Sequence, residues 1–273
     1  MKLFNVVTDA EIIPLFFEKT KTKLNVMVSY PYCKGNVYKL AVEYRDMIDE
    51  LYLDSGAFPA QKGKVTITIS EYRRFIRRYG NYFNTVFTLD DNFTNPDHNF
   101  NYQAYLEEAL PDGVKRLVPV IHDEKKPFEE FETYVEQGHD YIAIGSNKKL
   151  SDKIWNEIKK NFPDVKIHMF GNLNRKMLFG HKPYSADAST WANQAGMGSI
   201  YYWDPIDSRD YLINLGGREK KDDFNSFKHK AELESFLSEI FGYDHSRLLT
   251  DHSARWIVNL YFFKQLEDII NAE

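Results

Sequence analysis

Short runs of β-branched and aromatic residues recur along this chain between longer stretches with helical spacing, and this alternation is its most constraining feature. The predicted strands are Leu24–Ser29, Leu51–Leu53, Thr85–Leu89, Leu117–Ile121, Tyr141–Ile144, Lys166–Phe170, Tyr184–Ala186 and Ser199–Trp203. Helical patterns between them include Ile69–Tyr79 with Ser70 as its cap, Gln103–Leu110, Pro127–Glu136 and Ser151–Asn161. Eight strands alternating with helices favour a closed parallel sheet, so the prediction is an α/β fold, a single (β/α)8 TIM barrel.

The length of 273 residues suits one such barrel, which typically needs about 250. We therefore expect a single domain over 1–273, with 214–273 forming C-terminal helices packed on the barrel. The segment Gly216–Asp223 is predicted to be a mobile surface loop. No GxGxxG follows the first predicted strand and no GxxxxGK[ST] occurs, so dinucleotide and P-loop sites lose their main support.

Composition limits the classes of partner and site. The net charge of −5 gives no global attraction to a polyanion, so nucleic-acid binding would need a local basic patch. A lone cysteine, Cys33, excludes an internal disulfide and a zinc site built from several thiolates. We expect no metal and no cofactor. No apolar run approaches the roughly 20 residues of a membrane span, and the first residues lack a signal-peptide pattern, so we expect a cytoplasmic protein without a membrane partner.

Polar residues follow the predicted strands, at the end of a barrel where chemistry takes place. Asp54, Asp90 and Asp187 each come directly after an apolar strand, so a barrel would direct all three into one cleft. Mutual repulsion and burial can then separate their pKa values into acid and base roles. For each aspartate alone, a helix cap or loop hydrogen bond is the alternative.

Other strand-end residues are candidates for substrate contacts. Gly56, Gly145 and Gly171 would let a flat ligand approach the backbone, or serve turn geometry only. His122 is a candidate base, a donor to substrate, or a satisfied loop histidine. His168 alternates with the apolar residues of its strand and is read as filling a barrel layer.

These strand ends resemble motifs of the queuine/archaeosine tRNA-guanine transglycosylase superfamily, especially its short phage and bacterial members that act on DNA. The similar segments are Asp54-Ser55-Gly56-Ala57-Phe58, Leu89-Asp90, Val120-Ile121-His122, Tyr141 to Ser146, Phe170-Gly171-Asn172, Asp187, and Leu248 to Phe262. The resemblance covers the chain from about Leu51 to its C-terminus. Val258 stands where the family's zinc-binding histidine would be and no cysteine cluster is present, so zinc is not expected and the substrate shifts from tRNA towards DNA.

The resemblance implies exchange of guanine for a 7-deazaguanine base through a covalent aspartyl-glycosyl intermediate, a pentosyltransferase activity. Asp187 would be the nucleophile and Asp54 the acid/base partner, while Asp90 would bind the edge of the base. The other implied substrate-binding residues are Ser55, Gly56, Phe58, His122, Gly145, Ser146, Phe170 and Gly171. Phe58, Tyr184 or Trp191 could stack on an extruded base.

A row of arginines is the candidate nucleic-acid contact. Arg73, Arg74, Arg77 and Arg78 share about half of one predicted helix and could bind phosphates, or form a solvated helix face. The expected partners are DNA, less favourably tRNA, and guanine or a 7-deazaguanine base. The alternatives are a tRNA-guanine transglycosylase, a glycoside or nucleoside hydrolase, and a catalytically silent nucleic-acid-binding barrel. The oligomeric state stays open.

Overall fold

The computed structural model describes residues 1–108, 110, 117–122, 126–145, 152–171, 174–216 and 222–273. By their internal contacts these residues form two compact units. The barrel unit comprises Met1–Thr8 and Asn25–Ala188, and the second unit comprises Asp9–Leu24 and Ser189–Glu273. A single domain over the whole chain stays a prediction.

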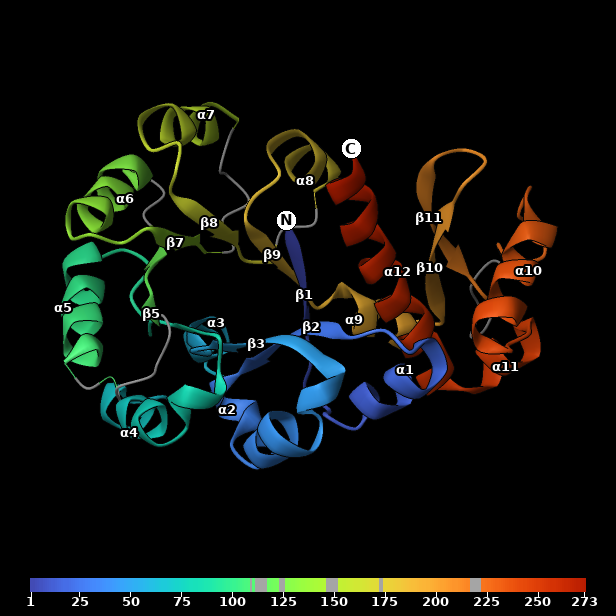
Figure 1. Cartoon of the computed structure of the whole chain (residues 1–273), viewed down its shortest axis with the longest axis horizontal. Coiled ribbons are helices and arrows are strands. Elements are labelled where there is room, and N and C mark those ends of the chain that lie inside the picture. The colour runs from blue at the N-terminus through green and yellow to red at the C-terminus, as the bar shows by residue number, and fades with distance from the viewer. Residues whose placement is uncertain (109, 111–116, 123–125, 146–151, 172–173, 217–221) are drawn as a thin grey trace. The chain divides into compact units, whose positions relative to one another are not determined.

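The barrel unit is built on one parallel sheet (Figure 1). Its strands are β1 (Lys2–Val6), β2 (Leu24–Ser29), β3 (Ile48–Asp54), β4 (Thr85–Phe87), β5 (Leu117–Val118), β6 (Val120–Ile121), β7 (Tyr141–Ile144), β8 (Lys166–Met169) and β9 (Ser185–Ala188). The order in the sheet is β5-β4-β3-β2-β1-β9-β8-β7-β6.

The two ends of this sheet are consecutive in the chain, because only Pro119 separates β5 from β6. Val118 O accepts a hydrogen bond from Thr88 N on one side, and Pro119 O accepts one from Ala143 N on the other. Proline has no N–H to donate, which interrupts the strand without ending it. The segment 117–121 thus works as one barrel strand, and the predicted α/β TIM-type barrel with C-terminal helices is confirmed.

The helices of the barrel unit lie around the outside of the strands (Figure 1). They are α2 (Tyr30–Cys33), α3 (Ala57–Gln61), α4 (Ile69–Tyr79), α5 (Pro96–Glu107), α6 (Pro127–Glu136), α7 (Asp152–Asn161) and α8 (Arg175–His181), with short turns η1 (Lys39–Glu43), η2 (Arg45–Met47) and η3 (Gly80–Tyr82). The cap of α4 is Thr68, whose Oγ1 accepts from Glu71 N, so the predicted cap Ser70 is wrong.

The second unit contains the hairpin of β10 (Ser199–Asp204) and β11 (Arg209–Asn214). Its helices are α1 (Ile12–Thr20), α9 (Thr190–Gly196), α10 (Lys230–Phe241), α11 (His245–Thr250) and α12 (His252–Ala272). Asn259 joins three of these elements: its Nδ2 donates to Trp191 O and Ser199 O, and its Oδ1 accepts from Tyr201 N. Asp251 caps the N-terminus of α12.

Two strand predictions are corrected. The predicted eighth strand, Ser199–Trp203, pairs antiparallel with β11 in the second unit and is not part of the barrel. The strand that completes the barrel is β1, which pairs in parallel with both β2 and β9. The predicted loop Gly216–Asp223 falls mainly on 217–221, outside the described residues. No described helix is both long and apolar enough to cross a membrane.

Candidate active site at the C-terminal end of the barrel

The candidate site is the interior layer of side chains directly above the apolar core of the barrel. That core comprises Phe4, Met27, Tyr52, Phe87, Val118, Val120, Tyr141 and Ala143. Successive side chains of a strand point to opposite faces, so residues two positions further on also face inwards. Ser29, Asp54, His122 and Gly145 follow core residues at this spacing, and Asp187 follows the buried Ser185. These strand-end residues form what we call the site layer, together with Asp90 and Ser55.

Asp54 is the last residue of β3, and the pKa of its carboxyl group is strongly shifted. Burial raises the pKa of its carboxyl to about 7. The neighbouring Ser29 side chain and the Gly56 backbone oppose this rise, while the charges of Asp90 and Asp187 add to it. The three predicted aspartates are therefore close enough to influence one another. At neutral pH Asp54 can both donate and accept a proton.

The turn after Asp54 requires glycine. Gly56 has φ +82°, in the left-handed region, and a Cβ there would lie 2.6 Å from Pro31 Cδ. The Gly56 backbone forms its hydrogen bond with the Asp54 carboxyl from this turn. The motif Asp54-Ser55-Gly56 is thus a strand-to-helix turn that fixes the carboxylate.

Asp90, which is buried, pairs with His122, which is partly buried. His122 Nε2 contacts Asp90 Oδ2, and Ser55 Oγ donates to Asp90 Oδ1 at 3.3 Å. Burial raises the pKa of Asp90, and the charge of His122 opposes this. A carboxylate on one ring nitrogen orients a histidine and leaves the other nitrogen for a proton transfer.

The imidazole of His122 is held in a narrow slot. One face lies against Gly145, where a Cβ would come within 1.9 Å of the ring carbon Cε1. The Phe93 ring stacks with the imidazole at a centroid distance of 3.8 Å. The His122 backbone N–H donates to Glu130 Oε2 at 3.0 Å. The slot therefore fixes the orientation of His122 towards Asp90.

Asp187 is the last residue but one of β9 and is 5% exposed. Its Oδ1 accepts a hydrogen bond from the Gly171 N–H at 2.7 Å and lies 3.4 Å from His168 Nε2. His168 is fully buried, and its Nδ1 is 2.7 Å from Ser185 Oγ. The reading of His168 as filling a barrel layer is incomplete, because this side chain also joins a polar network.

The structure separates the other predicted site residues. Phe58 is 56% exposed at the start of α3, and Phe170 packs on the barrel core. Ser146 lies outside the described residues. Tyr184 precedes β9, at the opposite end of the strands from the site layer, and its carbonyl accepts from Lys2 N. Trp191 is buried in the second unit.

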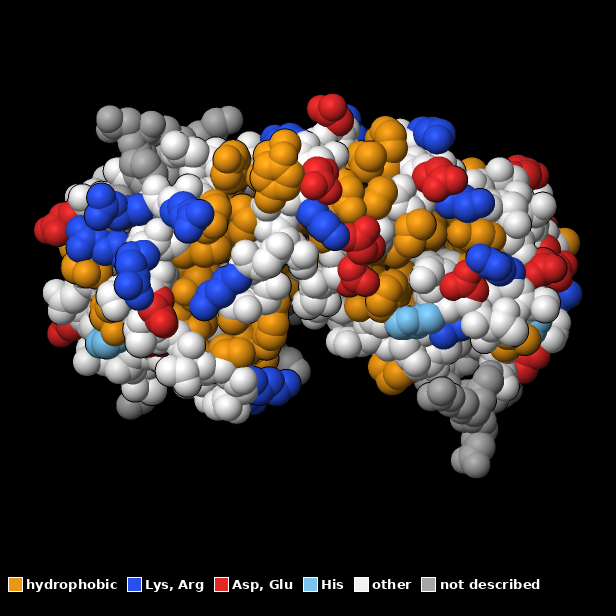
Figure 2. All heavy atoms as spheres, turned by 90° about the horizontal axis from the view of Figure 1, so that it is seen from below, with side chains coloured by type: hydrophobic (Ala, Val, Ile, Leu, Met, Phe, Trp, Pro, Cys, Tyr) orange, Lys and Arg blue, Asp and Glu red, His pale blue; other side chains and the backbone are white. Residues whose placement is uncertain are grey.

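The arginine row lies on α4. Arg74, Arg77 and Arg78 are exposed, whereas Arg73 packs its guanidinium over the Tyr105 ring at 4.1 Å. Figure 2 shows basic side chains gathered over the part of the barrel unit that carries α4. A phosphate-binding role for this row, and a nucleic-acid partner, stay predictions.

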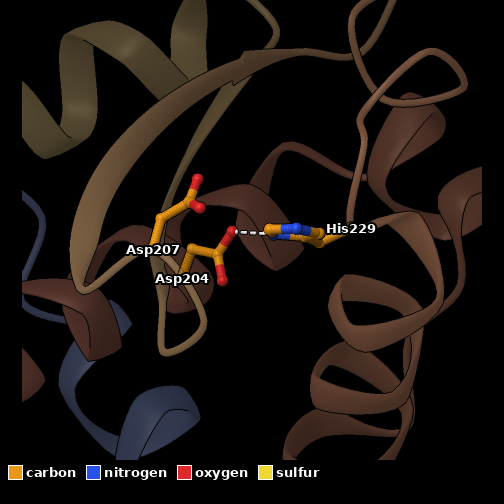
Figure 3. Close-up of side chains that lie close together, drawn as sticks. All are labelled: Asp204, Asp207 and His229. Atoms are coloured by element: carbon orange, nitrogen blue, oxygen red, sulfur yellow. Dashed lines mark hydrogen bonds and ion pairs between the residues drawn. The ribbon is translucent and has the colours of Figure 1, made fainter.

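A cluster of Asp204, Asp207 and His229 in the second unit is the one group of three ligand-type side chains close enough to hold a metal within the described ranges (Figure 3). Its groups already have partners. Asp204 accepts from Ile206 N at 2.9 Å and lies 2.5 Å from His229 Nδ1, while Asp207 accepts from Tyr211 and pairs with Lys228. This arrangement explains the cluster as a set of hydrogen bonds and ion pairs that holds the hairpin to the segment before α10.

A cavity of about 570 Å³ also lies in the second unit, lined by Phe224, His245 and Arg247 among others. His245 stacks on Phe224 at 4.2 Å, and its Nε2 lies 3.2 Å from Leu215 O. Arg247 pairs with Asp251. Because His245 and Arg247 already have partners within the protein, this cavity is a weaker candidate for an active site than the site layer of the barrel.

Sequence reasoning missed three residues that shape the site. Ser29 lies near Asp54 and lowers its pKa, Phe93 stacks on His122, and Glu130 accepts a hydrogen bond from the His122 backbone N–H. Ser29 could have been found, because it ends a predicted strand as Asp54 does. Phe93 and Glu130 come from a loop and a helix whose packing against the strand ends no local pattern gives.

No protein-family model matches the chain, and no curated protein matches it. A solved structure titled "putative fructose-1,6-biphosphate aldolase" from Coccidioides immitis is similar over 99% of this chain and 89% of its own, with 12% identity and a TM-score of 0.58. Another, titled "Native KDPGal structure", matches 70% of this chain and 83% of its own, with 10% identity and a TM-score of 0.44. The likeness to the first shows a shared barrel fold.

These comparisons overturn the predicted resemblance to guanine transglycosylases. No family model and no curated sequence supports that resemblance, and the solved structure that is similar over 99% of this chain carries an aldolase title. The same finding corrects the predicted guanine exchange, the predicted DNA modification and the pentosyltransferase class. It also corrects the three alternatives, namely a tRNA-guanine transglycosylase, a glycoside or nucleoside hydrolase and a catalytically silent barrel. The physical reason is that the matched motifs are strand-end turns: Gly56 is required by its positive φ and Gly145 by the ring of His122. Such motifs follow from the geometry of a barrel and do not identify one particular reaction.

Proposed function

We propose that the barrel unit is an enzyme that transfers protons to and from a small polar carbonyl compound, and that its reaction is of the aldol type. The observation that carries the proposal is the Asp54 carboxyl, whose pKa of about 7 suits a group that donates and accepts protons at neutral pH. The aldolase title of the similar barrel supplies the reaction class to test first. The site layer supplies the chemistry.

In this proposal Asp54 and His122 work as an acid and a base. His122, oriented through Nε2 by Asp90, accepts the proton of a substrate hydroxyl group on Nδ1. The carbon–carbon bond next to that hydroxyl breaks, which gives one carbonyl product and leaves its electron pair as an enolate on the other. Asp54 donates its proton to the enolate oxygen, so the second product leaves as an enol.

A second route to aldol cleavage forms a Schiff base with a lysine. The described members of the site layer are Ser29, Asp54, Ser55, Asp90, His122, Gly145 and Asp187, and none of these is a lysine. The acid–base route is therefore the one that the described residues support.

The experiment is a nuclear magnetic resonance assay of hydrogen exchange. The full chain is incubated in D2O with a panel of uncharged and phosphorylated hydroxyketones, and loss of the proton signal next to the carbonyl group is followed. We expect exchange or cleavage with at least one compound, and its loss in Asp54→Asn and His122→Gln. Asp49→Asn, an exposed change on the same strand, is the matched control and should retain the rate. Equal rates in Asp54→Asn and the unaltered chain would refute the proposal.

A further inference from the structure

A buried chain of polar side chains runs through the barrel interior to Asp187. The Tyr141 hydroxyl lies 2.6 Å from Ser185 Oγ, and Ser185 Oγ lies 2.7 Å from His168 Nδ1. On the other side of the ring, His168 Nε2 lies 3.4 Å from Asp187 Oδ1. Tyr141, Ser185 and His168 are each 2% exposed or less. Water therefore has little access to these links.

The chain has a direction. His168 Nε2 lies 3.4 Å from Asp187 Oδ1, and a carboxylate oxygen accepts hydrogen bonds, so a neutral ring with its proton on Nε2 points that proton at an acceptor. Nδ1 then accepts from the Ser185 hydroxyl at 2.7 Å. The Ser185 hydroxyl has one proton, so Ser185 Oγ in turn accepts from the Tyr141 hydroxyl at 2.6 Å. A neutral histidine that accepts on Nδ1 carries its proton on Nε2, which faces Asp187.

The end of the chain is incomplete. His168 Nε2 is buried and has no partner with good hydrogen-bond geometry, and its 3.4 Å separation from Asp187 Oδ1 exceeds the usual N–H···O distance of about 2.9 Å. Buried polar groups are almost always satisfied, and catalytic hydrogen bonds often tighten only when substrate binds. Burial lowers the pKa of His168, with the nearby Asp187 carboxyl opposing, so the ring is neutral at neutral pH.

We propose that His168 is a positioning residue that, as the Nε2–H tautomer, directs a hydrogen-bond donor at Asp187 Oδ1 from the end of the chain Tyr141–Ser185–His168. A role of His168 in catalysis rests on the proposed function of the barrel unit. Asp187 and Asp54 then differ in their partners: Asp187 Oδ1 faces the donors of His168 and Gly171, and Asp54 carries the exchangeable proton of the proposed function. Two neighbouring carboxyl groups thus have separate tasks.

The test measures the tautomer of His168 and needs no substrate. Nitrogen-15 spectra of histidine ring nitrogens are recorded on the full chain at neutral pH. The His168 signal is assigned by its loss in His168→Gln, or by ring contacts with Phe87 and Phe170 if that variant does not fold. We expect a protonated Nε2 and an acceptor Nδ1. A proton on Nδ1 in the unaltered chain overturns the proposal.

Variants of the chain give the second arm. Ser185→Ala removes the donor to Nδ1 and should abolish the single Nε2–H signal in favour of mixed tautomers, and Tyr141→Phe should do so to a smaller extent. Tyr134→Phe is the matched control, because Tyr134 is equally buried and its hydroxyl has no hydrogen-bond partner. An unchanged His168 spectrum in folded Ser185→Ala would also overturn the proposal.

The effect of His168 on catalysis is tested in a separate experiment. If a substrate emerges from the exchange assay, His168→Gln should lower kcat with little change in KM, because His168 acts on Asp187 and contacts no substrate. If no carbonyl compound reacts but the tautomer is Nε2–H, the proposed function fails and the positioning of Asp187 stands. If the tautomer is Nδ1–H while substrate reacts, the reverse holds.

Discussion

The imidazole of His122 occupies the space in which a side chain at Gly145 would lie. A Cβ on Gly145 would come within 1.9 Å of Cε1, 2.2 Å of Nδ1 and 2.6 Å of Nε2 of that ring. His122 and Gly145 directly follow the adjacent strands β6 and β7, so the glycine after one strand makes room for the imidazole after the other. The geometry of the Asp90–His122 pair therefore depends on the absence of a side chain at position 145.

Gly145→Ala should displace His122 from Asp90. Distances below 3.0 Å cannot be accommodated without movement, and Phe93 blocks the other face of the ring. We expect a destabilisation of about 1–3 kcal/mol from overpacking, together with loss of activity. Chemical denaturation measures the first effect, and a changed His122 ring signal in NMR measures the displacement. Gly180→Ala is the control, since no atom lies within 4 Å of its added Cβ, and it should be neutral or stabilising.

Asp54→Asn should change how stability depends on pH. The folded pKa of Asp54 is raised from 3.8 to about 7, so the folded state binds the proton more tightly than the unfolded chain does. Its contribution to stability is full below about pH 4 and is lost as the pH rises to about 7, up to roughly 4 kcal/mol at 1.36 kcal/mol per pKa unit. Asparagine mimics the protonated form, so this pH slope should disappear.

The measurement is urea denaturation between pH 5 and 8. Asp54→Asn should be more stable than the unaltered chain at pH 8 and closer to it at pH 5. Asp49→Asn, exposed on the same strand, should keep the original slope. Parallel curves for Asp54→Asn and the unaltered chain would show that Asp54 titrates alike in the folded and unfolded states.

The sequence predicts the fold class because strand periodicity is local, but it does not predict strand partners. The aromatic run Ser199–Trp203 has the pattern of a barrel strand, yet its partner is β11 through an antiparallel hairpin. The strand Lys2–Val6 is just as short and mixes Lys2 and Asn5 with apolar residues, so its pattern is weaker. Both errors arise because pairing depends on contacts between segments far apart in the chain.

Part of the candidate site can also be predicted from the sequence, and part of it cannot. Asp54, Asp90, His122 and Asp187 are predictable because they end strands, and parallel strands of a barrel end at one rim. The hydrogen-bond chain from Tyr141 to His168 is not, because its members lie on β7, β9 and β8 and meet only after the barrel closes. Reaction chemistry was the least predictable part, since turn motifs such as Asp54-Ser55-Gly56 serve the backbone as well as a substrate.

Asn259→Ala should destabilise the second unit. Asn259 is fully buried, and its loss would leave Tyr201 N–H and the carbonyl groups of Trp191 and Ser199 without this partner. Buried unsatisfied groups cost about 1–3 kcal/mol each, so we expect a loss on the order of 2–4 kcal/mol after relaxation. Asn271→Ala, an exposed change on the last turn of the same helix, should cost less than about 0.5 kcal/mol. Equal denaturation midpoints for the two variants would contradict the role of Asn259.

The Asp204–His229 pair should not depend on a bound metal ion. Asp204 is fully buried, and His229 Nδ1 and Ile206 N satisfy its carboxylate, while Lys228 neutralises Asp207. A metal ion would have to replace these contacts, so chelator treatment or added zinc should leave the melting temperature unchanged. His229→Ala should instead leave a buried carboxylate without its main partner and cost on the order of 3 kcal/mol. Asp207→Asn, which lies nearer the surface, should have a much smaller effect. Thermal denaturation of the unaltered chain with and without zinc, beside the two variants, makes the distinction. A rise in melting temperature with zinc that disappears in His229→Ala would show that the cluster binds metal.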